Sequence, residues 1–392
     1  MKAVFPGTIS THGRPATLGV MGGGQLGRMF VHASQRLGYA TVVLDPDAQS
    51  PAGMVSHQHV ITPYGDEAGL QQLAGLCDAV TTEFENVPAA ALRTLAMTLP
   101  VAPSAGCVAM AQNRIEEKAH FTACADVSGV SMAPYAVIET PAQLQAVPAN
   151  LLPGILKTAR MGYDGKGQVR VASRAALAQA WESLHSVPCV LEKMLPLEAE
   201  CSVLVARGAD GAMVHFPVQR NLHRDGILAV TDVYESNVPA PLAAQAVAAA
   251  ESIARGLEYV GLLCVEFFVL QDGSLVVNEI APRPHNSGHY TLDACDQSQF
   301  TLQVRTLAGL PLTPPRQHSA AVMLNLLGDI WADGTPDWAG VLALPGTHLH
   351  LYGKAQARFG RKMGHLTITA ATAEQARAVA LQAAQLLGIA AF

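Results

Sequence analysis

Charged side chains are scarce in this sequence, since Asp, Glu, Lys and Arg make up only 14% of its 392 residues. The net charge is −6, and no run of basic residues interrupts the chain. Proteins that bind nucleic acid usually carry such a run or patch, so nucleic acid is not indicated as a partner. An anionic small substrate stays possible, because a few local basic side chains can bind it whatever the net charge.

Long apolar runs and paired cysteines are also missing. No stretch reaches the roughly eighteen uncharged apolar residues that a membrane-spanning helix needs, and the start, MKAVFPGTISTHGRP, lacks the apolar core of a signal peptide. The seven cysteines are scattered and form no C-x-x-C pair, which argues against a disulfide framework and a zinc ribbon. We therefore expect no membrane contact and a reducing, cytoplasmic setting.

The length favours two or three domains, and 50% hydrophobic residues suffice for sizeable cores. The first part of the chain has the pattern of an open α/β domain. Strands are expected at 17–21, 41–44 and 78–85, and a helix at 26–37. A small α+β unit should follow, with short strands at 154–158, 167–172 and 189–194 around a helix at 174–184. The last part should hold strands at 198–207, 212–218, 260–270, 275–280, 347–352 and 363–369, with helices at 241–257 and 373–386.

A glycine-rich turn follows the first expected strand. The stretch TLGVMGGGQLGRMF contains Gly22-x-Gly24-x-x-Gly27, and Asp45 lies about twenty residues further on. This spacing is typical of dinucleotide-binding domains, so an oxidoreductase is one interpretation. However, free N–H groups and the helix dipole favour any anion at such a turn. The motif alone indicates a close anion or close packing, without naming a cofactor.

Two acidic residues stand in otherwise apolar strands near residue 270. Glu266 lies in VEFF and Glu279 in VNEI, on either side of a Q-D-G-S turn that predicts a β-hairpin. Unpaired buried carboxylates are costly, so such residues are usually paired or bind a metal. A hairpin can place the two opposite each other, and Asn278 would add an amide oxygen to a site suited to Mg²⁺. The alternative is that each glutamate pairs with an arginine in the core.

The segment ILKTARMGYDGKGQVRV could hold a phosphate. Lys157 ends a strand, and Gly162, Gly165 and Gly167 follow in a loop, where glycines let backbone N–H groups approach an anion. It is no Walker motif, because G-K-[ST] and the following helix are missing. An ordinary flexible hairpin tip is the alternative. A later stretch, CVLEKMLPLEAECSVLV, could offer its backbone to an adenine edge.

Taken in order, these segments resemble the ATP-grasp enzymes, and among them the N5-carboxyaminoimidazole ribonucleotide synthetases of purine biosynthesis. The resemblance runs from about residue 17 to about residue 386. It rests on GGGQLGRM, TTEFENVP, GYDGKGQ, NLHRDGIL, NEIAPRPHNSGH and GRKMGHL. It implies an ATP-grasp fold of mixed α/β and α+β class. The implied parts are a disordered extension (1–16), a Rossmann-like N-terminal domain (17–130), a lid (131–197) and a C-terminal ATP-grasp domain with a tail subdomain (198–392).

The resemblance also implies a reaction. Members of this family use ATP and bicarbonate to carboxylate 5-aminoimidazole ribonucleotide, through carboxyphosphate, and release ADP and phosphate. Mg²⁺ is the expected metal, with Mn²⁺ as a substitute, and a homodimer is the expected assembly. The N-terminal domain of the family binds no dinucleotide, and its glycine turn faces the ribonucleotide.

Site residues are carried over from the family motifs by position. Glu266 and Glu279 would hold the metal, Asp164 would orient the amine, and Arg283 would clamp bicarbonate or the transferred phosphoryl group. The implied contacts to ATP are Arg114, Lys157, Gly162, Tyr163, Asp164, Gly165, Lys166, Gly167, Gln168, Glu192, Lys193, Met194, Leu195, Glu200, His223, Asn278 and Glu279. The implied contacts to the ribonucleotide are Gly24, Gln25, Glu83, Tyr163, Asp164, Lys354 and Arg361, with Lys354 and Arg361 gripping its phosphate.

Some features depart from the family or stay outside this assignment. Met161 stands where a second glycine is expected before GYDG, and would stiffen the lid. The pairs His57-x-His59 and His348-x-His350 could suggest a metal, but on strands they should alternate onto a polar face, so none is expected there. The alternatives are another ATP-grasp ribonucleotide ligase or carboxylase and, less well supported, a binding module without activity.

Overall fold

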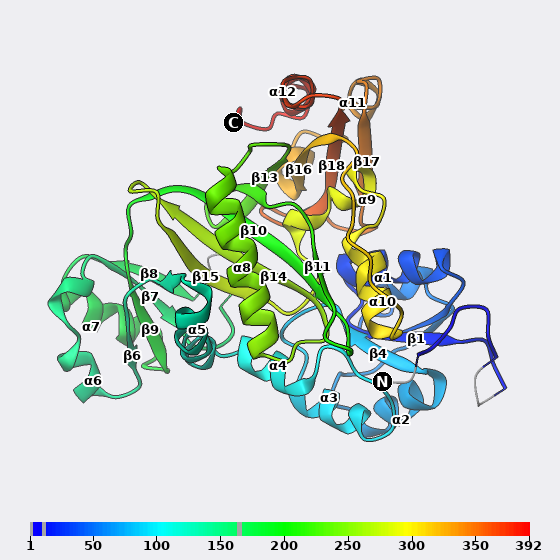
Figure 1. Cartoon of the computed structure of the whole chain (residues 1–392), viewed down its shortest axis with the longest axis horizontal. Helices are drawn as coiled ribbons and strands as arrows, with labels where there is room; N and C mark the ends of the chain where they lie inside the picture. The colour runs from blue at the N-terminus through cyan, green and yellow to red at the C-terminus, as the bar shows by residue number, and fades with distance from the viewer. Residues whose placement is uncertain (1–2, 10–12, 163–166) are drawn as a thin grey trace.

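The computed structural model describes residues 3–9, 13–162 and 167–392. Its N-terminal part, blue to cyan in Figure 1, is a parallel sheet whose strands run in the order β3-β2-β1-β4. Helices α1 and α10 cover one face, and α2, α3 and α4 cover the other, so both faces are buried and the strands are apolar. The elements are β1 (Thr17–Met21), α1 (Gln25–Arg36), β2 (Ala40–Leu44), η1 (Gly53–Val55), β3 (Gln58–Val60), α2 (Glu67–Leu76), β4 (Ala79–Thr82), α3 (Ala89–Ala96) and α4 (Ala105–Ala111).

A small antiparallel sheet in the order β6-β9-β7-β8 forms the lid. Its core joins the sheet to α7, whose first turn is capped by Ser173. Thr140 and Gln143 form a capping box on α6, a helix that the sequence analysis did not anticipate. The elements are β6 (Tyr135–Ile138), α6 (Pro141–Ala146), η2 (Ala149–Leu151), β7 (Gly154–Thr158), β8 (Gln168–Val171), α7 (Arg174–Ser183) and β9 (Cys189–Lys193).

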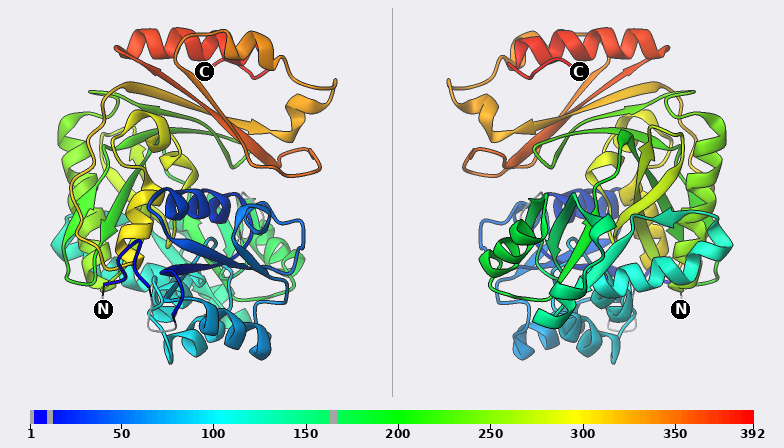
Figure 2. Two further views of the ribbon diagram at one scale, coloured as in Figure 1. Left: turned by 90° about the vertical axis from the view of Figure 1, so that its right-hand side faces the viewer. Right: turned by 90° about the vertical axis from the view of Figure 1, so that its left-hand side faces the viewer.

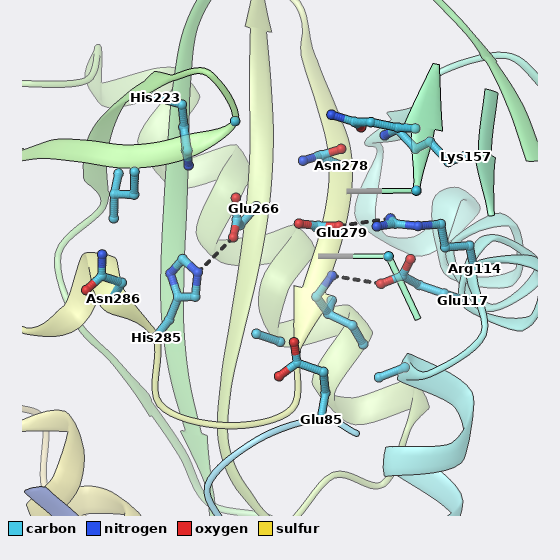
Figure 3. A pocket seen from close by; sticks show the side chains of 18 of the residues that line it. Glu85, Arg114, Glu117, Lys157, His223, Glu266, Asn278, Glu279, His285 and Asn286 are labelled. Carbon is cyan, nitrogen blue, oxygen red and sulfur yellow. Dashed lines mark hydrogen bonds and ion pairs between the residues drawn. The ribbon is translucent and has the colours of Figure 1, made fainter. Parts of the chain in front are cut away.

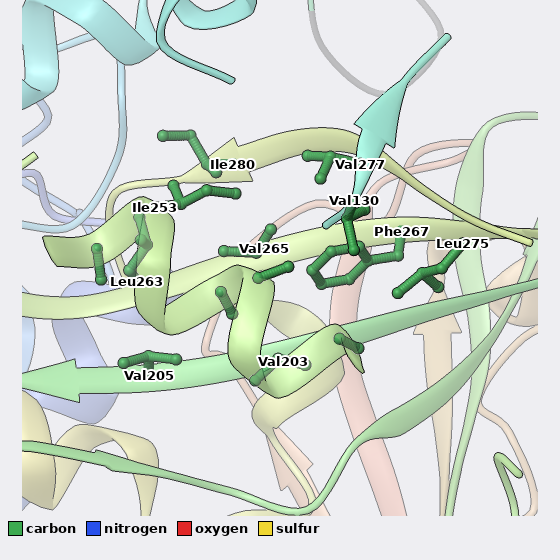
Figure 4. Packing of buried hydrophobic residues seen from close by; sticks show 14 of the residues in the cluster. Val130, Val203, Val205, Ile253, Leu263, Val265, Phe267, Leu275, Val277 and Ile280 are labelled. Carbon is green, nitrogen blue, oxygen red and sulfur yellow. The ribbon is translucent and has the colours of Figure 1, made fainter. Parts of the chain in front are cut away.

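A ten-stranded sheet forms the centre, in the order β17-β18-β16-β13-β12-β10-β14-β15-β5, with β11 beside β10. Helices α5 and α8 pack on one face. Figure 4 shows Ile253 of α8 together with valine and phenylalanine side chains of the strands. Helices α9 and α10 cover the other face, and α11 and α12 cover the β16–β18 end (Figure 2). The strands are β5 (Ser131–Met132), β10 (Leu197–Arg207), β11 (Met213–His215), β12 (Gln219–Arg224), β13 (Ile227–Val233), β14 (Gly261–Leu270), β15 (Leu275–Ala281), β16 (Ala320–Leu327), β17 (Thr347–Leu351) and β18 (Lys362–Ala370). The helices are α5 (Arg114–Ser128), α8 (Ala240–Gly256), η3 (Asn286–Gly288), α9 (Thr291–Ala294), α10 (Gln299–Leu307), η4 (Gly328–Trp331), α11 (Trp338–Leu342) and α12 (Ala373–Leu386).

Several elements differ from the sequence-based expectation. The strand expected at 78–85 ends at Thr82, because Glu83 turns back toward α1. The N-terminal extension was expected to be disordered, but Val4 donates its N–H to the Ala308 carbonyl and accepts from the Tyr39 hydroxyl. Among the residues described, no helix has the length and apolarity needed to cross a membrane.

Candidate active site

A cavity of about 880 Å³ lies where the N-terminal sheet, the lid and the central sheet meet. Most of the predicted site residues line it, although they come from distant parts of the chain. Those that do are Gln25, Glu83, Arg114, Lys157, Gly162, Gly167, Gln168, Glu200, His223, Glu266, Asn278, Glu279 and Arg283. Tyr163, Asp164, Gly165 and Lys166 lie outside the described residues.

The glycine turn at the start of α1 holds a carboxylate of the protein itself. The N–H groups of Gly24 and Gly27 donate to Glu83 over 2.6 and 2.8 Å. Gly23 donates to Asp45, which also accepts from the hydroxyl of Tyr64. These carboxylates occupy the place where a dinucleotide would bring its pyrophosphate and ribose. The oxidoreductase interpretation therefore fails. Among the described residues, Gly24 does not line the cavity but donates to Glu83, which does.

The two glutamates of the β14–β15 hairpin lie opposite each other. Glu266 and Glu279 are cross-strand partners, with a register shift directly after Glu266. Partners in an antiparallel pair project from the same face, and both side chains line the cavity (Figure 3). The turn between the strands is stabilised by Asp272, which accepts from the N–H of Ser274, and by Gly273 at a φ of 81°.

Each glutamate has a different partner. Glu266 contacts the imidazole of His285 over 3.0 Å, whereas Glu279 forms a 2.9 Å ion pair with Arg114. Burial alone would raise the pKa of Glu266, but His285 outweighs it and holds that pKa at about 2. The alternative of an arginine partner thus describes Glu279 but not Glu266. The Glu266 carboxylate therefore stays ionised at neutral pH.

Asn278 adds an unsatisfied oxygen beside these carboxylates. Its side-chain Oδ1 is buried and has no hydrogen-bond partner within the described part of the chain. A buried polar atom without a partner is costly, and a bound ligand is one explanation. Two carboxylates and an amide oxygen are donors that suit Mg²⁺. The residues present therefore fit the metal that the sequence implies.

A buried ion triad connects the lid to α5. Lys157 and Lys118 donate to the two oxygens of Glu192 over 2.7 and 2.8 Å. Burial opposes ionisation of Glu192, but the two ammonium groups lower its pKa to about 2. Sequence reasoning missed Lys118, although it lies one helical turn after Arg114, so both side chains lie on the same side of α5. The triad therefore has two lysines, Lys157 on lid strand β7 and Lys118 on α5, of which the sequence predicted only Lys157.

Arg283 is paired with a residue that was also missed. Its Nε donates to Glu85, in the TTEFENVP segment of the N-terminal part. Although burial favours the neutral acid, Arg283 lowers the pKa of Glu85 to about 2. Asn286 lines the same region, and its Nδ2 has no partner among the described residues. This part of the cavity therefore presents a guanidinium and an amide N–H to an incoming anion.

Glu117 links α5 to the hairpin. Its Oε1 accepts from the backbone N–H of Ile280 over 2.9 Å, directly after Glu279. Burial raises its pKa to about 7, against the opposing effect of Arg114. The side chain therefore ties α5, which carries Arg114, to the strand that carries Glu279. Apart from its place between Arg114 and Lys118, no feature of the sequence marks Glu117 as part of the site.

Of the predicted residues that the structure describes, seven do not line the cavity. Lys354, between β17 and β18, donates to the Lys362 carbonyl over 2.7 Å. Burial raises the pKa of Glu83, and the positive charge of Lys354 partly opposes this rise. Arg361 lies in the same connection between β17 and β18, where it donates to the Gln356 carbonyl through a hydrogen bond that is exposed to solvent. The other five are Gly24, Glu192, Lys193, Met194 and Leu195; of these, Gly24 and Glu192 contact cavity-lining residues directly.

The remaining predictions near the lid and the adenine region can be placed. Glu200 and His223 form a 2.6 Å ion pair at the edge of the cavity. Met161 has a φ of 62°, a left-handed conformation that favours glycine, and its side chain is exposed. The backbone therefore has the geometry of the expected glycine, with a bulkier residue in that place.

Comparisons with known proteins agree with this arrangement. Models of the ribonucleotide synthetase preATP-grasp domain, the ATP-grasp domain and the phosphoribosylaminoimidazole carboxylase C-terminal domain match residues 16–112, 123–300 and 321–379. The N5-carboxyaminoimidazole ribonucleotide synthase of Brucella melitensis is 43% identical over 90% of this chain and 96% of its own length. The chain belongs to this family. It is thus an ATP-dependent ligase that carboxylates 5-aminoimidazole ribonucleotide in purine biosynthesis.

Solved structures of the family superpose on nearly the whole chain. An N5-carboxyaminoimidazole ribonucleotide synthetase in complex with ADP has a TM-score of 0.87 at 38% identity, covering 98% of this chain and 97% of its own. The Aspergillus clavatus enzyme, solved with ADP and 5-aminoimidazole ribonucleotide, has a TM-score of 0.85 at 32% identity, covering 95% and 98%. The ATP-grasp fold expected from the sequence is confirmed, as is the narrower choice among ATP-grasp ligases.

Proposed function

We propose that this chain uses ATP to activate bicarbonate as carboxyphosphate inside the cavity, and that the activated carbon then reaches the amine of the ribonucleotide. The observation that carries this proposal is the cross-strand pair of Glu266 and Glu279 on the cavity wall. Bicarbonate is a poor electrophile, and several negative groups must meet before it reacts. Neutralising and positioning these charges is therefore the main task of the site.

Glu266 and Glu279 would hold Mg²⁺, with Asn278 beside them, and Mn²⁺ would substitute. Held there, the ion would supply positive charge that offsets the repulsion between the phosphates. Arg114 leaves its ion pair with Glu279 to contact the phosphates when nucleotide binds. Lys157, already held by Glu192, offers its ammonium group to the same anion.

The second anion, bicarbonate, would bind at Arg283. The Glu85 carboxylate orients the guanidinium through Nε, and Nη1 donates to the Pro284 carbonyl over 3.1 Å. The other terminal nitrogen, Nη2, would face the oxyanion. Glycines 162 and 167 flank the lid loop, which would close over the nucleotide and exclude water from an intermediate prone to hydrolysis. Asp164, within that loop, would orient the amine.

The ribonucleotide would extend from this point toward the β17–β18 connection. Gln25 and Glu83 lie on the cavity wall, and Lys354 would grip the ribose phosphate together with Arg361. Support comes from the Aspergillus clavatus relative, whose structure contains both ADP and 5-aminoimidazole ribonucleotide. We further propose a homodimer in the cytoplasm, where seven free cysteines, all buried, would stay reduced.

The test is phosphate release from ATP in the presence of bicarbonate, with and without 5-aminoimidazole ribonucleotide. Stimulation by that compound, with formation of a carboxylated product from labelled bicarbonate, is the expected result. Release of phosphate that does not depend on bicarbonate would contradict the carboxyphosphate route. Stimulation by a different ribonucleotide amine alone would contradict the acceptor.

A further inference from the structure

A second group of metal-ligating side chains lies outside the cavity. Asp293 comes from α9, His350 from β17 and His365 from β18, and none of them lines the cavity. One ligand atom from each lies within 4.8 Å of those of the others. Asp293 Oδ2 is 2.9 Å from Nε2 of His350, and its Oδ1 is 3.7 Å from Nδ1 of His348. The group is therefore nearly assembled without a ligand.

His365 provides an independent sign that a ligand is missing. The residue is completely buried, and its Nδ1 lies 2.9 Å from the hydroxyl of Tyr352. Its Nε2 is also buried and has no hydrogen-bond partner among the described residues. Metal-ligating histidines typically bond through one ring nitrogen to a neighbouring group, which orients the other toward the metal.

We propose that Asp293, His350 and His365 bind one divalent transition-metal ion of the zinc class, at a site separate from the nucleotide-dependent metal. Two imidazoles and one carboxylate form a donor set that zinc takes, whereas Mg²⁺ prefers oxygen atoms alone. Water or His348 would supply the fourth ligand of the ion. The sequence predicts no metal at His348-x-His350, because histidines two apart on a strand should share a polar face. The ligands from α9 and β18 are far away in the sequence, so that spacing does not reveal them.

Binding requires one local adjustment. The rings of His350 and His365 are cross-strand neighbours stacked at 10°, with centroids 4.4 Å apart. Two parallel rings cannot both point at one ion, so at least one must rotate about its Cβ–Cγ bond. The side chain of His350 is 31% exposed, which gives it room to turn and gives the ion a route from solvent.

The position of the site gives the ion a structural role. Helix α9 follows the segment that carries Arg283 and His285, and the β17–β18 connection carries Lys354 and Arg361. An ion held by Asp293 and the two histidines would tie the proposed bicarbonate segment to the proposed phosphate-gripping connection. Because such an ion binds only the folded chain, it should raise the thermal midpoint.

Cobalt(II) is a suitable probe, because it replaces zinc and absorbs visible light according to its ligands. The full-length protein, freed of metal and held in excess Mg²⁺, would be titrated with Co²⁺. We expect one Co²⁺ per chain with the spectrum of nitrogen and oxygen ligands, displaced by Zn²⁺. His350→Gln should weaken this binding by at least about tenfold. The control His318→Gln, at an exposed histidine outside the group, should bind as the unaltered protein does.

Two results would overturn the proposal. One is undiminished Co²⁺ binding by both His350→Gln and a second variant, Asp293→Asn. The other is a thiolate-to-cobalt absorption band, which would place the ion at Cys264, beside Glu266 and His285, in the other group of possible ligands. Circular dichroism and the metal-free thermal midpoint check that each variant folds. Activity without added transition metal should be unchanged in His350→Gln, which separates this test from that of the proposed function.

Discussion

The glycine turn at α1 and the β14–β15 hairpin both place polar groups against apolar strands, but they differ in what remains unsatisfied. At the turn, Glu83 and Asp45 take up the free N–H groups of the three glycines at 23, 24 and 27. At the hairpin, the oxygen of Asn278 has no partner among the described residues, and two carboxylates face the cavity. A motif that favours an anion can thus be satisfied internally, whereas a ligand site keeps unsatisfied groups.

The largest expected loss of activity follows a substitution in the β14–β15 hairpin. Glu279→Gln should lower ATP-dependent phosphate release by about 10²-fold or more, because it removes one charged ligand of the proposed metal. The fold should stay intact, since the amide oxygen can still accept from Arg114 and the residue is only partly buried. Steady-state phosphate assays and circular dichroism are the measurements. Glu182→Gln, at an exposed glutamate on helix α7 of the lid, is the control and should keep normal activity. Near-normal activity in Glu279→Gln would show that Glu279 is not a ligand of the metal.

A second prediction concerns the connection between β17 and β18. Lys354→Ala should raise the KM for the ribonucleotide by roughly 10-fold or more while changing kcat less, because a charge-assisted hydrogen bond to phosphate contributes about 1.5–3 kcal/mol. The KM for ATP should stay the same. Arg358→Ala, in the same connection and exposed, should leave both constants unchanged. Equal KM values for the ribonucleotide in the Lys354→Ala and unaltered proteins would exclude this contact.

A substitution in the glycine turn should lower the stability of the protein. A Cβ at Gly24 would lie 2.4 Å from Oε1 of Glu83, so Gly24→Ala should lower the free energy of unfolding by about 1–3 kcal/mol. Gly75→Ala is the matched control, because a Cβ there meets nothing within 4 Å and the residue is helical; it should be neutral or slightly stabilising. Urea denaturation measures both. If Gly24→Ala were as stable as Gly75→Ala, the turn would not be tightly occupied.

The sequence predicted the elements whose pattern is local and regular. The strands at β1, β2, β7, β14 and β15 and the helices α1, α8 and α12 lie within one or two residues of their expected bounds. Strand β12, QRNLHR, was missed because it is central in the sheet yet polar, with His223 on the cavity wall. Its pattern resembles a loop, since a strand that lines a ligand site need not be apolar.

The site residues also differ in whether the sequence could predict them. Glu266 and Glu279 were found because acids in apolar strands are conspicuous, and a short hairpin fixes their register. Glu85 and Lys118 were missed because their partners, Arg283 and Glu192, are 198 and 74 positions away in the sequence. Only the packing of α5 and of the TTEFENVP segment against the cavity brings them together. Long-range ion pairs of this kind have no spacing that a single sequence reveals.

The most direct test of the account is the location of the metal. Crystals grown with ADP and Mn²⁺ would give an anomalous difference peak for the ion. The account predicts a peak in contact with a carboxylate oxygen of both Glu266 and Glu279 and with the nucleotide phosphates. A peak held by phosphates and water alone, with Glu266 still on His285 and Glu279 still on Arg114, would contradict it.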